Sequence, residues 1–239
     1  VLKSEKFRAI KQIVYVCLPL LVYVVLYDIC TALLQYLGYS ILGSLGNRGA
    51  VWLSANIGTF KALCIMGGLA LSFLCLSRMA WLDGFLNPKK EVWKVPIWQY
   101  VILIFGSILL TYGLNYLFTV TGFAASSESY QNVAQSQYNV SLVVGLILYG
   151  VVSPFVEEVI FRGFLYGRMK VYMHWIVALF LSSLLFGIYH GNWVQGVYGL
   201  IMGLIFGLVY EKYKNFYLPV IMHSIANLVA FLVEINGFF

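Results

Sequence analysis

The sequence has 239 residues, of which 62% are hydrophobic and only 10% charged, and its mean hydropathy is +0.87. A soluble domain carries about a quarter charged residues, so this composition excludes an ordinary soluble protein and predicts an integral membrane protein. The net charge of +6 is explained by membrane topology and gives no reason to expect a nucleic-acid partner.

Apolar stretches of about 20 residues, long enough to cross a bilayer, recur along the chain. We expect about seven such helices (six to eight), at residues 13–37, 55–77, 98–121, 140–160, 174–191, 195–210 and 217–238. The stretches are continuously apolar and include Gly-rich runs such as GLIMGLIFG, whereas the strands of a barrel would alternate in polarity. The expected fold is therefore all-α, that of a polytopic helical membrane protein.

Lysine and arginine gather in alternate connections between these spans, and such connections tend to stay cytoplasmic. The basic residues concerned are Lys3, Lys6, Arg8, Lys11, Arg78, Lys89, Lys90, Lys94, Arg162, Arg168, Lys170, Lys212 and Lys214. The N-terminus is therefore predicted to be cytoplasmic. Residues 123–139 carry no basic side chain and are predicted to form a polar extracytoplasmic loop. This loop divides N-terminal transmembrane helices, residues 1–122, from a four-helix core, residues 140–239, that holds every strong chemical motif.

Two charges stand out in the N-terminal helices. Asp28 and Lys61 lie near the outer ends of adjacent antiparallel spans. Because an ionisable group at membrane depth usually has a partner, we expect these two side chains to approach each other. The alternative is that Lys61 reaches the membrane surface alone.

The first motif of the core is SPFVEEVIFRGFLYGR, residues 153–168, which sets two adjacent carboxylates in an apolar run. In a helix, Glu158 and Arg162 stand four apart on one face and can form an ion pair. Glu157 is turned about 100° away from its neighbour. Pro154 can loosen the helix and admit water. We therefore expect Glu158 to hold the helix and Glu157 to be available for chemistry.

Two further motifs carry imidazoles. His190 lies in FGIYHGN, and His223 and Asn227 stand four apart in LPVIMHSIAN. Alone, each histidine is equally explained as a buried structural group, and Asn227 as an interhelical hydrogen bond. Together with Glu157 they supply the parts of a hydrolytic site. The carboxylate would take a proton from water, His190 would orient that water, and the last pair would donate hydrogen bonds to an oxyanion.

Three stretches match short motifs: EEVIFR matches E-E-x-x-x-R, FGIYH matches F-x-x-x-H, and HSIAN matches H-x-x-x-N. The motifs occur in the order found in the CAAX prenyl protease 2 and bacteriocin-processing family of intramembrane endopeptidases. The sequence resembles this family over residues 140–232, and the resemblance implies a helical peptidase whose catalytic core is residues 140–239. By position, Glu157 resembles the general base, His190 its water-activating partner, and His223 with Asn227 the oxyanion pair. Glu158, Arg162 and Phe186 match supporting positions.

The resemblance implies hydrolysis of a membrane-associated or lipidated peptide or protein, with membrane lipid as the other partner. It does not choose among prenylated proteins, peptide maturation and bacteriocin immunity. A non-catalytic membrane scaffold or bacteriocin-immunity protein of the same fold is the alternative, although a scaffold has no need for His190 and Asn227 together. A proton-coupled transporter is a third hypothesis, but the sequence shows no inverted repeat. The chain size favours a bacterial plasma membrane.

Metal dependence is open in the sequence. Glu157, His190 and His223 would supply the three protein ligands of a catalytic zinc. No H-E-x-x-H places two ligands on one helical turn, and we therefore expect a metal-free mechanism with zinc as the alternative. The expected spans also hold the two histidines apart, because His190 falls about 24 Å along its helix and His223 near the start of its own. To meet, the helices have to tilt or break around a water-filled cavity, or the segment after Arg162 has to stay longer at the inner surface.

Overall fold

The computed structural model describes residues 2–86 and 95–236, which form helices and no strands. The elements are α1 (Leu2–Ser44), α2 (Asn47–Asp83), α3 (Ile97–Val120), α4 (Glu128–Tyr138), α5 (Leu142–Ile147), η2 (Leu148–Val152), α6 (Ser153–Glu158), η3 (Val159–Tyr166), α7 (Gly167–Met169), α8 (Trp175–Tyr189), α9 (Trp193–Tyr213) and α10 (Tyr217–Ile235). Lys89, Lys90 and Lys94, which contribute to the predicted orientation, lie outside the described residues.

The expectation of a polytopic all-α membrane protein is confirmed. Within the described residues, six helices are long and apolar enough to cross a membrane, and α8 is a shorter apolar helix. The fourth of these spans is a single rod of 28 residues, Leu142–Met169, assembled from α5 to α7. Large apolar side chains such as Leu21, Leu74 and Val101 lie exposed on the outside of the bundle, as they do where lipid replaces water.

The rod from α5 to α7 forms the centre of the bundle. Two of its segments, η2 and η3, have the wider turns of a π-helix, and α6 lies between them. Pro154 lies in the first turn of α6 and has no N–H to donate to the turn before it, so η2 ends where the proline begins. Such wide turns often occur at functional positions, and Glu157 and Glu158 stand between the two.

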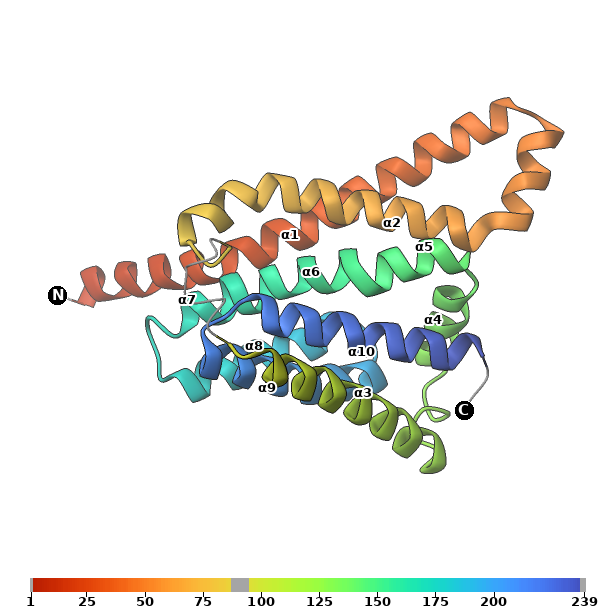
Figure 1. Ribbon diagram of the computed structural model, residues 1–239. Helices are drawn as coiled ribbons and strands as arrows, with labels where there is room; N and C mark the ends of the chain where they lie inside the picture. Colours follow the sequence, from red (N-terminus) through yellow and green to blue (C-terminus); the bar gives the residue numbers. More distant parts are fainter. Residues whose placement is uncertain (1, 87–94, 237–239) are drawn as a thin grey trace.

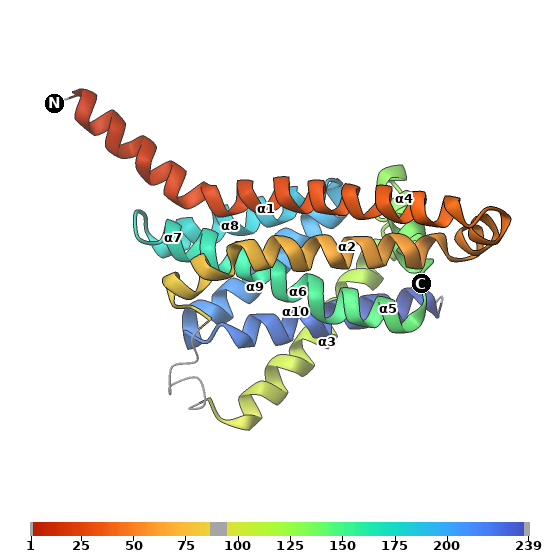
Figure 2. The ribbon, with the colours of Figure 1, turned by 90° about the horizontal axis from the view of Figure 1, so that it is seen from above.

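The other helices surround this rod. Helices α1 and α2 run antiparallel along one side of the bundle, and α3 lies on the opposite side (Figures 1 and 2). α1 packs on η3, α3 packs along α10, and α8 packs against α9. α8 and α9 approach at Gly187, where an added Cβ atom would strike the carbonyl oxygen of Gly196. The glycines therefore set how closely these two backbones approach.

The two ends of the bundle differ in charge. One end of the bundle holds the N-terminus, α7, the last turn of α2 and the connection from α9 to α10 (Figure 1). The other end holds α4 and the C-terminus. Basic residues of the described chain gather at the first end: Arg78, Arg168, Lys170, Lys212 and Lys214. Their common position fits the predicted orientation, which stays a prediction.

The segment 123–139, predicted as a loop, contains the helix α4. The hydroxyl of Ser127 caps it by accepting a hydrogen bond from the backbone N–H of Tyr130 at 3.2 Å. At its far end the backbone N–H of Ser141 donates to the hydroxyl of Thr59 on α2 at 2.9 Å. α4 therefore lies across one end of the bundle as an ordered element.

Candidate active site

The expected ion pair between Glu158 and Arg162 is present and fully buried. Arg162 Nε lies 3.1 Å from Glu158 Oε2, and the two side chains are 2% and 0% exposed. The other carboxylate oxygen of Glu158 lies 2.8 Å from Nδ1 of His223, which comes from α10. Glu158 thus joins the rod to α10 as well as holding its own helix.

Arg162 is held by aromatic rings in addition to its carboxylate partner. Its guanidinium carbon lies 4.5 Å from the ring centroid of Phe186 and 5.8 Å from that of Phe206. A Cβ atom at Gly203 of α9 would lie 3.2 Å from Arg162 Nη2, so this glycine provides the space for the guanidinium. Its terminal nitrogens Nη1 and Nη2 are buried and have no hydrogen-bond partner among the described residues, so the aromatic rings and the carboxylate of Glu158 are the groups that compensate for the buried charge.

Glu157 points away from this buried pair, as the helical spacing predicts. The Ser153 hydroxyl donates a hydrogen bond of 2.5 Å to Glu157 Oε1. Glu157 Oε2 lies 3.6 Å from His223 Nε2, too far for a hydrogen bond. The His223 ring is therefore placed between two carboxylates, with Nδ1 bonded to Glu158 and Nε2 facing Glu157.

His190 directly follows α8 as its C-terminal cap, and its imidazole has a defined tautomer. Its Nδ1 lies 2.8 Å from the carbonyl oxygen of Phe186, an atom that can only accept, so Nδ1 carries the proton. Nε2 is then the unprotonated nitrogen of the neutral ring, free to accept a proton or a hydrogen bond. A carbonyl that fixes the tautomer in this way is a common support for a functional histidine.

Phe186 lies between the two histidines. Its ring centroid is 4.9 Å from that of His190 and 5.6 Å from that of His223. The helices break to allow this, because α8 ends at Tyr189 and the chain turns back at Asn192, whose side chain caps α9. The sequence left open whether the helices break around a cavity or the segment after Arg162 stays longer at the inner surface. The structure has the first arrangement, with helices that break around a cavity.

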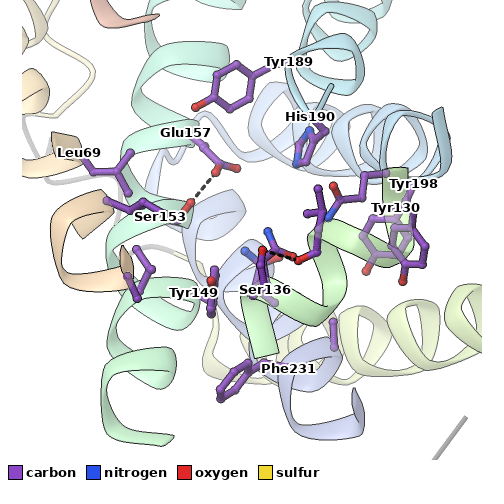
Figure 3. A pocket seen from close by; sticks show the side chains of 18 of the residues that line it. Leu69, Tyr130, Ser136, Tyr149, Ser153, Glu157, Tyr189, His190, Tyr198 and Phe231 are labelled. Carbon is purple, nitrogen blue, oxygen red and sulfur yellow. Dashed lines mark hydrogen bonds between the residues drawn. The ribbon is translucent and has the colours of Figure 1, made fainter. Parts of the chain in front are cut away.

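The cavity has a volume of about 570 Å³, and both Glu157 and His190 line it. Its lining includes Ser153, Glu157, Tyr189, His190 and Asn227, and from α4 it includes Tyr130, Val133, Ser136 and Gln137. Figure 3 shows Glu157 and His190 pointing into it from opposite walls. Burial raises the pKa of Tyr130 on α4, and the charge of Glu234 adds to this effect. From Glu157 the cavity extends toward α4, away from the basic end of the bundle.

The predicted site residues thus come together, though unequally. Glu157, Glu158, Arg162 and His223 form one connected network, and Phe186 links it to His190. Asn227 lines the cavity, and no hydrogen bond joins it to another described residue. Asp28 and Lys61 line the same cavity, but no ion pair joins them within the described chain.

The structure also adds side chains that the sequence motifs did not single out. Ser153 stands one helical turn before Glu157, and this i, i+4 spacing was a usable signal. Tyr189 lines the cavity, and its hydroxyl lies 2.9 Å from that of Tyr23 on α1. The two tyrosines are 166 positions apart in the sequence, so no local pattern predicts this contact.

The three residues of the zinc alternative are not arranged together as metal ligands. Glu157, His190 and His223 do not form a ligand cluster, and no group of three His, Cys, Asp or Glu side chains within residues 2–86 and 95–236 is arranged to hold a metal ion. A catalytic zinc would require the site to rearrange from the geometry described above.

Comparison with known proteins gives a family and three relatives. Residues 139–229 match the family model described as type II CAAX prenyl endopeptidase Rce1-like. UPF0177 protein YxdF of Lactococcus lactis is 27% identical over 166 residues, covering 67% of this chain and 90% of that protein. Putative membrane peptidase YdiL of Bacillus subtilis is 26% identical over 117 residues, or 49% and 47% of the two chains.

The third relative is membrane-embedded CAAX protease MroQ of Staphylococcus aureus, 21% identical over 149 residues, or 59% of this chain and 58% of that protein. The chain therefore spans only about half the length of the two relatives named as peptidase or protease. No solved structure matches.

Proposed function

We propose that the chain is an intramembrane endopeptidase, on the premise that its residues 139–229 match the model of the Rce1-like family of type II CAAX prenyl endopeptidases. It is a multi-pass integral membrane protein, and its relatives named as peptidase or protease are bacterial. The proposed reaction is hydrolysis of a peptide bond in a membrane-associated or lipidated peptide or protein. Water would be activated by a carboxylate and an imidazole.

Glu157 is the proposed general base. One of its oxygens is held by Ser153, and the side chain faces a cavity large enough to admit a peptide segment and water. His190 faces the same cavity with an unprotonated Nε2. A water between them would give its proton to Glu157 while its oxygen attacks the carbonyl carbon. That proton would pass to the leaving nitrogen as the C–N bond breaks, so the carboxylate is regenerated.

His223 and Asn227 are the proposed oxyanion donors. Glu158 fixes the His223 ring by accepting from Nδ1–H, so that Nε2 is directed toward the reacting groups beside Glu157. To donate from Nε2 as well, the ring has to act as the imidazolium, which carries a proton on both nitrogens. Asn227 lies one turn further along α10 and lines the cavity, where its carboxamide N–H groups have no described acceptor. Donors fixed in place before the reaction stabilise developing charge without a cost of reorganisation.

One observation carries the proposal. Glu157 and His190 project from opposite walls into one cavity, which lies in the membrane-spanning part of the chain. A non-catalytic scaffold of the same fold would have use for the buried Glu158–Arg162 pair, which joins helices. It would have no use for a carboxylate and a free imidazole nitrogen exposed to the same cavity. The mechanism is proposed to be metal-free, with Glu157 and His190 acting on the water directly.

Cleavage by the purified protein, in detergent and in lipid, tests the proposal. The panel contains prenylated peptides with a CAAX end and unprenylated leader peptides, each incubated with the wild type, Glu157→Gln and Glu128→Gln. Glu128 is an exposed carboxylate on α4 that does not line the cavity and serves as the matched control. We expect cleavage by the wild type and Glu128→Gln alone. Equal behaviour of wild type and Glu157→Gln on every peptide would leave the scaffold as the better hypothesis.

A further inference from the structure

Two tyrosines connect the candidate site to the N-terminal helix. The hydroxyls of Tyr23 on α1 and Tyr189 on α8 lie 2.9 Å apart. Tyr23 is 0% exposed, whereas Tyr189 is half-buried and lines the cavity together with Glu157 and His190. Figure 3 shows the Tyr189 ring near Glu157 at the edge of the cavity. Tyr23 lies far outside residues 139–229, the range that matches the family model.

Burial fixes the direction of this hydrogen bond. Tyr189 is the only hydrogen-bond partner of the Tyr23 hydroxyl among the described residues. If Tyr189 were the donor, the proton of Tyr23 would be buried without an acceptor, at a cost of about 1–3 kcal/mol. Tyr23 therefore donates and Tyr189 accepts, and stacking of Tyr23 on Tyr27, with ring centroids 5.9 Å apart, helps to hold the donor in place.

The proton of Tyr189 is then left for the cavity. A tyrosine hydroxyl has one proton, and the oxygen of Tyr189 is already engaged as an acceptor, so its own O–H has to point elsewhere. No hydrogen bond joins it to Glu157 or to another described residue besides Tyr23. A hydroxyl that accepts one hydrogen bond also becomes a stronger donor of the next. The site thus contains a polarised donor that the general base does not use.

We propose that Tyr189 is a further catalytic residue, whose hydroxyl donates a hydrogen bond to the substrate carbonyl oxygen as it becomes an oxyanion. Tyr23 is its positioning residue, because it orients the Tyr189 proton and does not reach the cavity. This inference rests on the proposed peptidase function and deepens it. It makes α1, outside the matched range, part of the catalytic machinery.

The competing explanation is that the two hydroxyls only tie α1 to α8. A structural tie would change the melting temperature and leave the turnover of the folded protein unaltered. A catalytic donor would change kcat with little change in KM, because its hydrogen bond strengthens only in the transition state. The coupling between the two residues separates these explanations further, because Tyr23 acts on the reaction only through Tyr189.

The test uses Tyr189→Phe, Tyr23→Phe, the double variant and Tyr217→Phe. Tyr217 is the control, because it does not line the cavity and its hydroxyl donates to the backbone carbonyl of Leu86. With a peptide that the wild type cleaves, we expect kcat of Tyr189→Phe to fall about 10- to 100-fold with KM within about twofold. Tyr23→Phe should lose about 3- to 10-fold, and the double variant should match Tyr189→Phe alone. Tyr217→Phe should stay within about twofold of the wild type.

Two results would overturn the inference: wild-type kcat in Tyr189→Phe, or losses from the two substitutions that simply multiply in the double variant. Melting temperatures and the folded fraction, measured on the same samples, show whether a lost rate is only lost protein. Glu157→Gln in the same assay identifies which proposal has failed. If Glu157→Gln is inactive and Tyr189→Phe is not, only the tyrosine inference falls; if Glu157→Gln cleaves normally, both fall.

Discussion

His223 directs Nδ1 to Glu158 at 2.8 Å and so couples the last described helix to a carboxylate that is completely buried in the rod. Glu158 therefore has two partners, Arg162 within its own helix and His223 outside it. Its neighbour Glu157 has a different environment, with one hydroxyl partner and a cavity in front of it. Substitutions at these two adjacent positions should have separable effects.

Glu157→Gln should remove activity while keeping the fold. The change preserves shape and leaves the Ser153 hydroxyl an oxygen to bond, but a carboxamide cannot accept a proton from water. General-base catalysis contributes about 10²- to 10⁴-fold, and a loss of this size in kcat is expected. Thermal unfolding in detergent, measured beside peptide cleavage, should give a melting temperature close to that of the wild type. A large drop in that temperature would mean that Glu157 has a structural role.

Glu158→Gln should destabilise the fold as well as remove activity. The change leaves the Arg162 guanidinium buried without its counter-charge, and breaking one side of a buried ion pair costs about 3–5 kcal/mol. The free energy of unfolding, measured by denaturant titration in mixed micelles, checks this expectation. The control is Glu128→Gln, which is exposed and should change stability by no more than about 0.5 kcal/mol. A Glu158→Gln protein as stable as this control would contradict the role given to the pair.

Gly187→Ala should separate α8 from α9. The added methyl group would strike the backbone carbonyl of Gly196, which cannot rotate away, and overpacking of this kind costs about 1–3 kcal/mol. Gly113→Ala on α3 is the matched control, because nothing lies within 4 Å of its added Cβ atom. The melting temperatures of the two variants should differ, with Gly113→Ala near the wild type. Because His190 ends α8 three residues later, Gly187→Ala should also lower the cleavage rate.

A strong zinc chelator should leave the cleavage rate unchanged, because the proposed mechanism uses Glu157 and His190 without a metal. The measurement is the rate before and after prolonged incubation with the chelator, with a known zinc peptidase treated in parallel to show that the chelator acts. Loss of activity that returns on adding zinc would contradict the metal-free mechanism. It would also require Glu157, His190 and His223 to come together more closely than the geometry described here.

Local sequence patterns predicted the parts of the site that depend on one helix. The spacing of Glu158 and Arg162 gave their ion pair, and the turn of about 100° between neighbours separated Glu157 from it. Hydropathy gave the spans, because a bilayer demands long apolar helices. The helix α4 was not predicted, because residues 123–139 are polar and were interpreted as a loop; in the structure Ser127 caps this helix.

Such local patterns could not predict the contacts between distant segments. The bond between Glu158 and His223 joins residues 65 apart, and the one between Tyr23 and Tyr189 joins residues 166 apart. Which helix faces which depends on packing, for example on the space that Gly203 leaves for Arg162, and no periodicity encodes that choice. The same limit applies to the cavity, which forms from segments of most of the helices at once.

The division of partners around Glu158 has a consequence for biosynthesis. Arg162 follows it within about one helical turn, so the rod can enter the bilayer with its costly charges already neutralised. His223 follows 65 residues later. At a synthesis rate of about 5–20 residues per second, that delay is several seconds. During this interval the nascent chain has a protected carboxylate and, later, His190, but it lacks His223 and Asn227, the proposed oxyanion donors. Hydrolytic competence is therefore withheld until α10 is inserted, and a ribosome-stalled intermediate that ends before α10 should be inert.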